Sequence, residues 1–411
     1  MSFRTSKPQM SEIPQLSHDQ KFEEERYPNY KAHQYYPVQL GQTFASRYRG
    51  RFRIVTASSD NSIRQDILVT LKVCILGEDE SNELAISHHI KSFDDGVHPG
   101  KHRSRVTLDD FHIRGPHGRH HCLVFPALGR TLAQVRNVFE DRKLDKLLLQ
   151  RFLYPILQGL DFLHQTGVVH TDISPNNILV EADDDMLANL EEQERLNPSP
   201  RKVLDDRVIH LSYTMPTSYK DPVITDFGAA YLGEPGQRYR DDVMPGVYRA
   251  PEVLAGMEWD SKIDIWSIGV MIWDLFEDGN LFPAYRNGHL DDELHFAQMI
   301  ALMGPPPKEF LDRMSETQRV RYWDSSGQYT LLHRKKGTWI AETPIPSQTL
   351  ESREIRLQGR DRELLFALMR KILCWLPEDR PSAEDLYNDG FIYQFVEYVM
   401  ELEESSLGKQ G

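Results

Sequence analysis

The stretch from Ile263 to Phe276 is apolar on nearly every side when it is drawn as a helix. Such a helix has to be buried all round, so other elements must surround it. In the stretch from Leu144 to His164 apolar residues recur at every third or fourth position, which predicts an amphipathic helix. The chain beyond Gly129 is therefore expected to fold mainly into helices packed around residues 263–276.

Before Gly129 the pattern is that of short strands. Runs of β-branched and aliphatic residues extend from Arg51 to Thr56, from Asp66 to Leu76 and from His121 to Phe125, which is typical of strands. Residues 84–90 carry apolar side chains at near-helical spacing. The expected fold class is α+β, with a small mixed sheet and one helix ahead of a larger helical part.

Three segments fall outside this pattern. Residues 1–35 are polar, contain proline and lack periodicity, so they are expected to form a disordered tail. Residues 182–222 form an insertion that begins acidic, contains Asn197-Pro198-Ser199-Pro200 and carries a candidate strand at Val208–Leu211. Residues 401–411 are expected to form a short polar tail.

Composition narrows the classes of function. The net charge of -14 argues against direct nucleic-acid binding, which needs a basic face, and is compatible with a basic protein partner. The sequence contains no run of about 18 apolar residues, so no membrane-spanning helix is expected. The stretch Met1–Thr5 lacks the apolar core that is typical of a signal peptide. The three cysteines, Cys74, Cys122 and Cys374, match neither a disulfide framework nor a zinc site. A reducing compartment, cytoplasmic or nuclear, is expected.

Chemistry is concentrated in two short motifs. Asp172 is followed by Asn177 within the loop that begins at His170, and Asp226-Phe227-Gly228 comes after the insertion. Phosphoryl transfer needs a base that orients the incoming hydroxyl and hard oxygen ligands that hold Mg²⁺ on the phosphates. Asp172 suits the first task, and Asn177 with Asp226 suits the second. A surface-loop aspartate and a turn asparagine after Pro175 are the alternative interpretations.

The order of the motifs resembles that of the eukaryotic protein kinases. His170-x-Asp172-x-x-x-x-Asn177 and Asp226-Phe227-Gly228 are similar to the catalytic and magnesium loops, and Ala250-Pro251-Glu252 is similar to the end of the activation segment. Arg380 matches the arginine that pairs with that glutamate. Thr171, the lead-in Tyr36–Gly41 and the stretch Val247–Glu252 resemble the SR-protein kinases, particularly their fungal-type members. The stretch Asp291–Pro305 resembles the insert of the wider group that also holds cyclin-dependent and MAP kinases.

The resemblance implies a bilobal kinase fold and ATP with Mg²⁺ as cofactors. The N-lobe would span residues 36–128, and the C-lobe would span residues 129–400 with the insertion 182–222. Lys72 matches the lysine that contacts the α- and β-phosphates. Glu83 is the expected helix partner of Lys72, with Glu78 and Glu80 as competing candidates.

The hinge between the lobes is also implied. Phe125 resembles the gatekeeper at the end of the hinge strand, although a bulky aromatic there is equally a core residue. Leu128 would offer backbone groups to adenine. Both positions follow the run His121–Phe125.

The chain departs from the family pattern at the glycine-rich loop. The stretch Tyr48–Thr56 has Gly50 as its only glycine, as though the loop had been removed and its flanks joined. Backbone amides that approach phosphate closely need residues without a Cβ. Arg49, Arg51 and Arg53 are expected to be ordinary strand-edge charges, so a weakened affinity for ATP is expected.

Two further departures alter one small network. Ser174 replaces the lysine that steadies the γ-phosphate, and Pro245 replaces a threonine that bridges this lysine and the aspartate. Removing one such electrostatic contact typically costs about 3 kcal/mol, roughly a hundredfold in rate. Slower catalysis is therefore expected. The segment from Asp226 to Glu252 contains no serine or threonine, so its control by phosphorylation of those residues is excluded.

The predicted function is a monomeric serine/threonine kinase of protein substrates, including basic Arg-Ser-rich ones. The acidic run Asp291-Asp292-Glu293 and the net charge motivate that substrate class. The alternative is a pseudokinase, a binding module that keeps the fold without productive ATP geometry. A small-molecule phosphotransferase is a third hypothesis, which Ala250-Pro251-Glu252 and Asp264-x-Trp266-Ser267 oppose.

Overall fold

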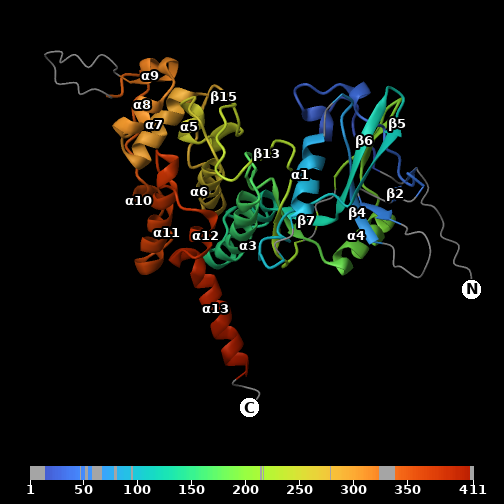
Figure 1. Ribbon diagram of the computed structural model, residues 1–411. Helices are drawn as coiled ribbons and strands as arrows, with labels where there is room; N and C mark the ends of the chain where they lie inside the picture. Colours follow the sequence, from blue (N-terminus) through green and yellow to red (C-terminus); the bar gives the residue numbers. More distant parts are fainter. Residues whose placement is uncertain are drawn as a thin grey trace, which may run out of the picture. The chain divides into compact units, whose positions relative to one another are not determined.

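A computed structural model of the chain describes residues 14–46, 48–50, 54–57, 67–77, 81–93, 96–212, 215, 217–277, 279–323 and 338–407. The chain divides into two compact units, which Figure 1 shows in ribbon form. The first unit comprises Met1–Ser92, Arg105–Arg130 and Leu179–Asp221. The second comprises Phe93–Ser104, Thr131–Ile178 and Pro222–Gly411.

The first unit is built on an antiparallel sheet. Among the described residues its strands are β1 (Thr43–Phe44), β2 (Tyr48–Gly50), β3 (Ile54–Ala57), β4 (Ile67–Val73), β5 (Asp109–Arg114) and β6 (Arg119–Pro126), in the order β1-β2-β3-β4-β6-β5. The expectation of a mixed sheet is wrong, because every strand pair in this sheet is antiparallel. The strands β3, β4 and β6 lie where the apolar runs predict them.

Each face of β4 packs against different partners. On one face Val69 joins Phe44, Tyr48 and Val124 in a buried cluster. On the other face Cys74 packs with Leu123, Phe125 and Leu84, and Leu84 belongs to α1 (Ser81–Ser92). This helix confirms the helical spacing of residues 84–90. The alternation along β4 is the reason why Lys72 and Val73 point to opposite sides of the sheet.

The insertion carries more structure than the sequence predicts. The strand β11 (Val208–His210) confirms the candidate strand, and it pairs with β10 (Arg201–Val203). A helix, α4 (Asp184–Leu196), occupies the acidic stretch that the sequence marks only as polar. Its buried Leu187 and Leu190 pack against Leu68 of β4. Residues Leu179–Asp221 therefore group with the first unit, whereas the sequence-based division assigns residues 182–222 to the C-lobe.

Residues 14–35 differ from the disordered tail that the sequence predicts for residues 1–35. They contain two short 3-10 helices, η2 (Glu23–Arg26) and η3 (Ala32–Gln34). The Glu25 carboxylate accepts hydrogen bonds from Lys202 Nζ of β10 at 2.9 and 3.1 Å. Charge periodicity along the sequence could not reveal this contact, because its two residues lie 177 positions apart. The remainder of the predicted tail lies outside the described residues.

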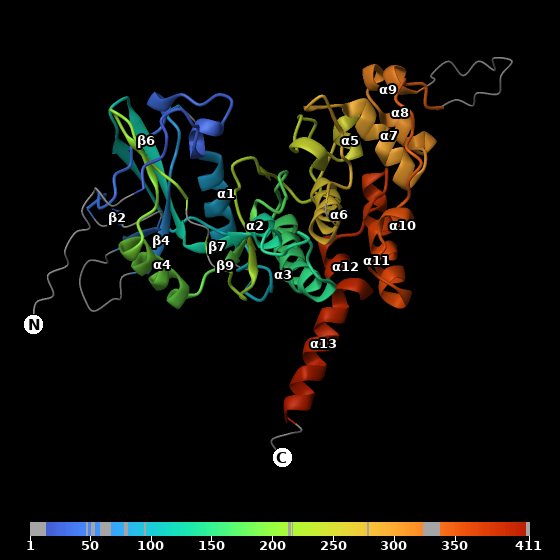
Figure 2. The same ribbon diagram turned by 180° about the vertical axis from the view of Figure 1, so that it is seen from behind.

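The second unit is helical and surrounds α6 (Lys262–Phe276), which is buried along nearly its whole length. The helix α3 (Lys146–Gln165), which the apolar pattern predicts, and the helix α11 (Gly359–Ile372) contact it. The other helices of this unit that the structure describes, visible in Figures 1 and 2, are α2 (Leu132–Arg136), α5 (Pro251–Leu254), α7 (Asp292–Met303), α8 (Lys308–Arg313), α9 (Glu316–Tyr322), α10 (Leu350–Arg353), α12 (Ala383–Tyr387) and α13 (Gly390–Leu407).

Short strands and turns complete the second unit. The strand β8 (Val168–Val169) pairs with β13 (Tyr231–Leu232). Further elements are β12 (Pro222–Ile224), η4 (Gly246–Tyr248), β14 (Tyr285–Arg286), β15 (His289–Leu290) and η5 (Pro377–Asp379). The helix α13 includes residues 401–407, which the sequence assigns to a polar tail. No described helix is both long and apolar enough to cross a membrane.

Candidate active site

The buried helix α6 fixes the loop that carries Asp172. The carboxylate of Asp264, which is inaccessible to solvent, accepts the backbone N–H groups of His170 and Thr171, both at 2.8 Å. His164 Nε2 lies 3.0 Å from the same carboxylate. A buried charge is expensive unless hydrogen bonds satisfy it, and here these donors do so. Asp264 of α6 thereby fixes the position of the loop that carries Asp172.

His170 orients the loop and does not face a substrate. Its imidazole is fully buried and packs against the ring of Phe227, with ring centroids 5.3 Å apart. Nδ1 lies 3.2 Å from the Asp172 backbone N–H, and Nε2 lies 3.0 Å from the carbonyl of Thr225. These partners require a neutral ring that accepts at Nδ1 and donates at Nε2. The packing and backbone role that the sequence indicates for His170 matches this arrangement.

Asn177 holds the side chain of Asp172. Its amide Nδ2 donates to Asp172 Oδ2 at 2.8 Å and to the Asp172 carbonyl at 2.9 Å. Burial raises the pKa of the Asp172 carboxyl, and the charges of Asp226 and Asp264 raise it further, while the hydrogen bond from Asn177 opposes the shift. A carboxylate with a raised pKa is a stronger proton acceptor.

Asp226 is brought next to Asn177 through its neighbour in the chain. Thr225 donates both its backbone N–H and its hydroxyl to the carbonyl of Asn177, each at 2.9 Å. Asp226 itself adopts a left-handed backbone with a φ of 66°, a conformation that non-glycine residues rarely hold except at functional sites. The unit thus brings Asp172, Asn177 and Asp226 together.

The donor set of this unit fits Mg²⁺. Because Nδ2 of Asn177 points to Asp172, its Oδ1 is the oxygen left to face a cation, and Asp226 adds a carboxylate. Magnesium is typically bound through one or two such groups plus phosphate oxygens and water. A dedicated cluster of three or more His, Cys, Asp or Glu side chains does not occur in the described part of the chain. A magnesium ion held by this set would need further oxygen ligands, such as phosphate oxygens or water, to complete its coordination.

In the first unit Lys72 forms an ion pair with Glu83. Lys72 Nζ on β4 lies 2.7 Å from Glu83 Oε2 on α1, and the Glu83 side chain is only 4% exposed. Of the three glutamates that the sequence offers, Glu78 and Glu80 lie outside the described residues. The contact has the form that the resemblance implies, and the roles of Lys72 and Glu83 toward a nucleotide stay predictions.

The hinge candidates occupy the end of β6 and the start of β7 (Leu128–Thr131). Phe125 is 2% exposed, and the guanidinium of Arg105 lies over its ring at 4.5 Å from the centroid. Phe125 is thus a core residue, and its role as gatekeeper stays a prediction. Leu128 is half-buried at the first position of β7. Its backbone contact with adenine remains a prediction.

The strands β2 and β3 show how little chain is left for a phosphate loop. Gly50 is paired with Val55 in their antiparallel register, so four residues separate the two partners. Arg51 and Arg53 lie outside the described residues, and Arg49 pairs with Thr56 within the ladder. The observed register agrees with the expectation that the flanks of the usual loop have been joined.

The two substituted network positions differ in their surroundings. Ser174 is 9% exposed, and its carbonyl accepts the backbone N–H of Asn177 at 3.0 Å. Pro245 is exposed and precedes η4 with a φ of -79°, a value that proline adopts without strain. Neither position supplies a positive charge to the Asp172 loop.

Sequence reasoning missed two residues that position this loop. Asp264 was recognised as part of a motif but not as the acceptor of the loop's backbone. Thr171 has a φ of 66°, and its hydroxyl donates to the carbonyl of Ala229 at 2.9 Å. A charged residue within an otherwise apolar helix was the available signal for Asp264. The strained backbone of Thr171 has no such signal.

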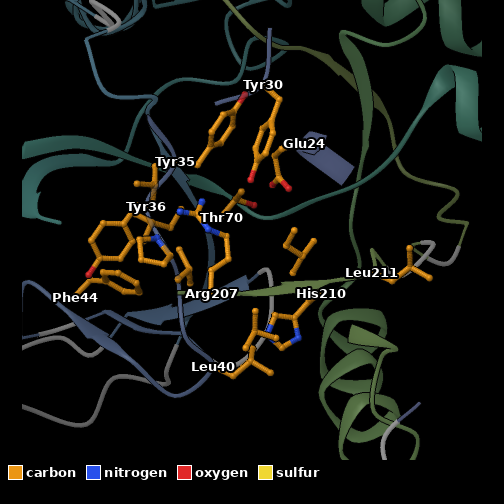
Figure 3. Close-up of a pocket in the computed structure, with 16 residues that line it drawn as sticks. Glu24, Tyr30, Tyr35, Tyr36, Leu40, Phe44, Thr70, Arg207, His210 and Leu211 are labelled. Carbon is orange, nitrogen blue, oxygen red and sulfur yellow. The ribbon is translucent and has the colours of Figure 1, made fainter. Parts of the chain in front are cut away.

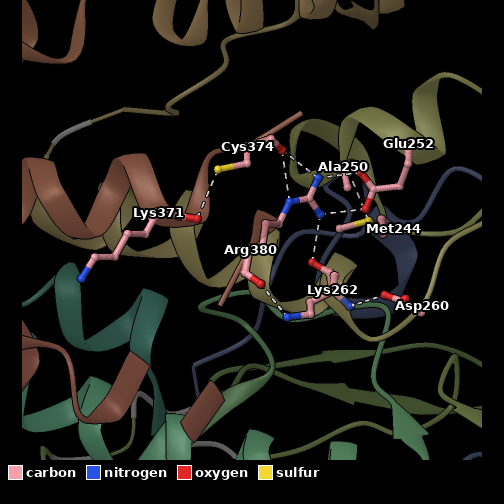
Figure 4. A network of polar contacts seen from close by, with 8 residues as sticks. All are labelled: Met244, Ala250, Glu252, Asp260, Lys262, Lys371, Cys374 and Arg380. Carbon is pink, nitrogen blue, oxygen red and sulfur yellow. Dashed lines mark hydrogen bonds and ion pairs between the residues drawn. The ribbon is translucent and has the colours of Figure 1, made fainter. Parts of the chain in front are cut away.

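The end of the activation segment is anchored as the sequence predicts. Arg380 Nη1 and Nη2 donate to Glu252 Oε1 and Oε2, both at 2.7 Å, and neither side chain is exposed (Figure 4). The same guanidinium donates to the carbonyls of Cys374 and Lys262. The pairing of Arg380 with the glutamate of Ala250-Pro251-Glu252 is confirmed.

Comparisons with known proteins agree with this geometry. Residues 101–392 match the protein kinase domain family. The chain is 33% identical over 94% of its length to the serine/threonine protein kinase AFUB_078980 of Aspergillus fumigatus, with 94% of that protein covered. It is 26% identical to the serine/threonine-protein kinase SRPK of Physarum polycephalum, covering 88% of this chain and 90% of that one.

Two further matches extend the comparison. The protein kinase dsk1 of Schizosaccharomyces pombe is 24% identical, with 93% of this chain and 87% of that protein covered. The fold resembles the crystal structure of the PF14_0431 kinase domain, with a TM-score of 0.62 at 19% identity over 87% of this chain and 99% of that one. The family match begins at residue 101, after Lys72 and the altered loop. The chain therefore belongs to the protein kinase family, with the α+β fold and the SR-protein-kinase-like relatives that its motifs predict.

Proposed function

We propose that this chain transfers the γ-phosphate of ATP, with Mg²⁺, to serine or threonine hydroxyls of protein substrates, including basic Arg-Ser-rich ones. The observation that carries the proposal is the Asp172 carboxylate held at 2.8 Å by Asn177 within a loop that Asp264 fixes from below. Phosphoryl transfer asks a protein for positioning and charge and little else. The Asp172 carboxylate supplies the charge, and the Asn177 amide positions it for the hydroxyl that accepts the phosphate.

Asp172 is the proposed base. It accepts a hydrogen bond from the substrate hydroxyl and takes its proton as the bond to phosphorus forms. Its raised pKa favours that transfer, as long as the pH keeps the group ionised. Asn177 Oδ1 and Asp226 would hold Mg²⁺, which neutralises charge on the phosphates when it is bound. Lys72, kept in place by Glu83, would contact the phosphates from the first unit.

The basic substrate class rests on charge and on the relatives. A net charge of -14 favours encounters with cationic segments. The acidic run of the sequence contributes less than expected, because Asp291 pairs with Arg286 at 2.9 Å and the Glu293 carboxylate accepts the backbone N–H of Thr343 at 2.7 Å. The exposed Asp242 is likewise paired, with Arg249, so a cationic substrate has to compete for this carboxylate.

We further propose that the kinase is active without phosphorylation of its activation segment. The hydroxyl candidates of that segment are tyrosines, and each is engaged. The rings of Tyr231 and Tyr239 lie 5.0 and 4.9 Å from that of Trp259, and the Tyr248 hydroxyl donates to Asp274 at 2.9 Å. Phosphorylation of Tyr248 would have to break its hydrogen bond to Asp274, and the hydroxyl oxygen of Tyr239 is itself buried.

The test combines nucleotide binding and phosphate transfer. Calorimetric titration with ATP should show binding that strengthens with Mg²⁺ in the parent and loses this dependence in Asp226→Ala. Asp172→Ala should bind nucleotide as the parent does, yet transfer phosphate to an Arg-Ser peptide about 100 to 10,000 times more slowly. Asp312→Ala, an exposed carboxylate on α8, is the matched control and should change neither quantity.

The outcomes separate the candidate functions. Absence of nucleotide binding by the parent would overturn the enzyme and favour a pseudokinase with impaired ATP binding, which the short β2–β3 connection supports. Binding of nucleotide without transfer by the parent would also favour a pseudokinase. Equal transfer by the parent and Asp172→Ala would remove Asp172 as the base. A Glu-Ser peptide and an Arg-Tyr peptide of equal length measure the charge and hydroxyl preferences, and equal rates on all three peptides would overturn the substrate class.

A further inference from the structure

The first unit contains a cavity of about 430 Å³ that the kinase reaction does not use. Its walls come from three parts of the chain, namely residues 24–44, the strand β4 and the residues 207–211 around β11. Ligand sites in proteins typically measure about 300 to 1,000 Å³ and combine an apolar lining with a few polar groups. This cavity has both properties.

The walls are fastened to each other by polar contacts, so the cavity is a built site. Residues 23–25 are tied to the insertion, since Glu25 pairs with Lys202 at 2.9 Å and the Glu23 carboxylate accepts the N–H of Ser212 at 2.6 Å. The backbone N–H of Leu76 donates to the carbonyl of Gln34 at 2.9 Å. Both the insertion and the end of β4 therefore hold the N-terminal segment in place.

The polar side of the cavity carries opposite charges. Figure 3 shows the Arg207 guanidinium in the middle of the lining, with Thr70, Tyr30 and Glu24 on one side. The Arg207 side chain is only 5% exposed. It donates to the Asp206 carboxylate at 2.7 and 3.1 Å and to the carbonyl of Ala32 at 2.5 Å. A further hydrogen bond joins Arg207 to Tyr30, so the guanidinium keeps little of its five-donor capacity for a ligand.

Glu24 supplies the negative charge on the same side. Its carboxylate is exposed and takes part in no salt bridge within the part of the chain that the structure describes. Burial raises the pKa of Tyr30, the positive charge of Arg207 and its hydrogen bond oppose this shift, and the negative charges of Glu25 and Glu24 add to it. The Tyr30 hydroxyl therefore contacts Arg207 and lies within the electrostatic influence of Glu24.

The other side of the cavity is apolar. Tyr36 and Phe44 lie there in Figure 3, with ring centroids 6.3 Å apart in an edge-to-face arrangement. Val38 and Leu40 extend the surface toward solvent and are 40% and 41% exposed. Apolar side chains of this size need a reason to stay accessible, and a bound apolar group covers them.

We propose that this cavity binds a zwitterionic α-amino acid with an aromatic or branched apolar side chain. The ligand carboxylate faces Arg207, its ammonium group faces Glu24, and its side chain lies among Tyr36, Phe44 and Leu40. Charge-assisted hydrogen bonds of this kind are about twice as strong as neutral ones. A ligand with only one of the two charges forms only one of these charge-assisted hydrogen bonds.

The site lies behind the strand that carries Lys72. Leu71 and Val73 line the cavity, and Lys72 between them points to the opposite face of β4, where it meets Glu83. A ligand in the cavity therefore contacts the strand that positions this lysine.

The test uses three probes that share one side chain. L-phenylalanine carries both charges, N-acetyl-L-phenylalanine lacks the ammonium, and L-phenylalaninamide lacks the carboxylate. Titrations of the full chain, followed by ligand-observed NMR, should show each blocked probe binding about tenfold or more weakly than L-phenylalanine, which corresponds to roughly 1.4 kcal/mol. The blocked probes also imitate the last and the first residue of a peptide, so a preference for either would overturn the amino-acid proposal.

Variants locate the site. Glu24→Gln should weaken L-phenylalanine about tenfold and leave N-acetyl-L-phenylalanine unchanged. Glu401→Gln on α13, also an exposed glutamate, is the matched control and should alter neither. Leu40→Trp should fill the cavity and abolish binding of all probes while the thermal unfolding temperature stays within a few degrees of the parent. The absence of saturable L-phenylalanine binding, or equal effects of Glu24→Gln and Glu401→Gln, would overturn the proposal.

Discussion

The carboxylate of Glu252 and the guanidinium of Arg380 form a two-bonded ion pair, both bonds at 2.7 Å, across 128 positions of sequence and without exposure of either side chain. A guanidinium matches a carboxylate in this fork-to-fork geometry. The pair joins the end of the activation segment to the turn before α12. Its members therefore stabilise the second unit and fix the segment at once.

Removing one partner of this pair should be strongly destabilising. Glu252→Gln leaves the Arg380 charge buried without its counterion, and such single substitutions typically cost about 3 to 5 kcal/mol. Arg380→Lys keeps the charge but loses the second bond, so a smaller loss is expected. Urea unfolding monitored by tryptophan fluorescence measures both. Lys308→Ala, which removes an exposed pair with Asp312, should stay within about 0.5 kcal/mol.

Asp264→Asn should slow transfer without preventing nucleotide binding. The amide can accept only at one atom, whereas the carboxylate accepts from both His170 and Thr171. One backbone N–H then faces an amide donor, and the Asp172 loop shifts. Small displacements of a catalytic group can cost about a hundredfold in rate. A steady-state assay should show the loss in kcat, with the Kd for nucleotide within about twofold of the parent.

The control for that variant is the surface aspartate Asp379, which is exposed in η5. Asp379→Asn should leave kcat unchanged. If Asp264→Asn retains the full kcat while its stability falls, Asp264 supports the fold only and does not position the loop.

The sequence predicts the elements that depend on local pattern. The apolar run at 263–276 becomes α6, and the motif residues Asp172, Asn177 and Asp226 meet in one unit. The sequence does not predict structure that depends on ion pairs between residues far apart in the chain. One example is the pair of Glu25 and Lys202, which holds the segment ahead of β1 against the insertion. The helix α4 was missed because its apolar face, Leu187 and Leu190, is small within an acidic stretch.

Ser174→Lys should restore part of the missing transition-state charge. The position follows Asp172 by two residues, where the family usually has a lysine, and no positive side chain replaces it in the described network. One electrostatic contact of this kind is worth about 3 kcal/mol at most, so kcat should rise severalfold or more with an unchanged KM for peptide.

The control for Ser174→Lys is Ser174→Met, which has similar length and no charge. Ser174 is only 9% exposed, so both variants test whether a longer side chain fits at this position. Only the lysine variant also tests the effect of a positive charge. A rise in kcat that is equal in both variants would mean that packing and not charge limits the reaction.

The stability of the second unit should depend on pH through Asp274. Burial raises the pKa of Asp274 to about 6, against the hydrogen bonds from Tyr248 and Leu281, whereas an unfolded chain has an aspartate pKa of about 3.9. A raised folded pKa means that the folded state binds the proton more tightly. The stability that the protonated Asp274 contributes is therefore fully present below about pH 4 and is lost as the pH rises through about 6. The loss is at most about 3 kcal/mol.

Asp274→Asn isolates this contribution, because an amide is neutral at every pH and can still serve both partners. Its Oδ1 can accept the N–H of Leu281, and its Nδ2 can donate to the Tyr248 oxygen, since a phenol also accepts hydrogen bonds. Urea unfolding at pH 4 and pH 7 should show that the parent loses stability relative to the variant as the pH rises. Asp361→Asn should change the acidic side of the stability profile, because hydrogen bonds from Lys146 and Gln394 lower the pKa of Asp361. The stability that Asp361 contributes is lost as the pH falls. Parallel pH profiles of the parent and Asp274→Asn would contradict the raised pKa, because no proton would then be bound differently by the two states.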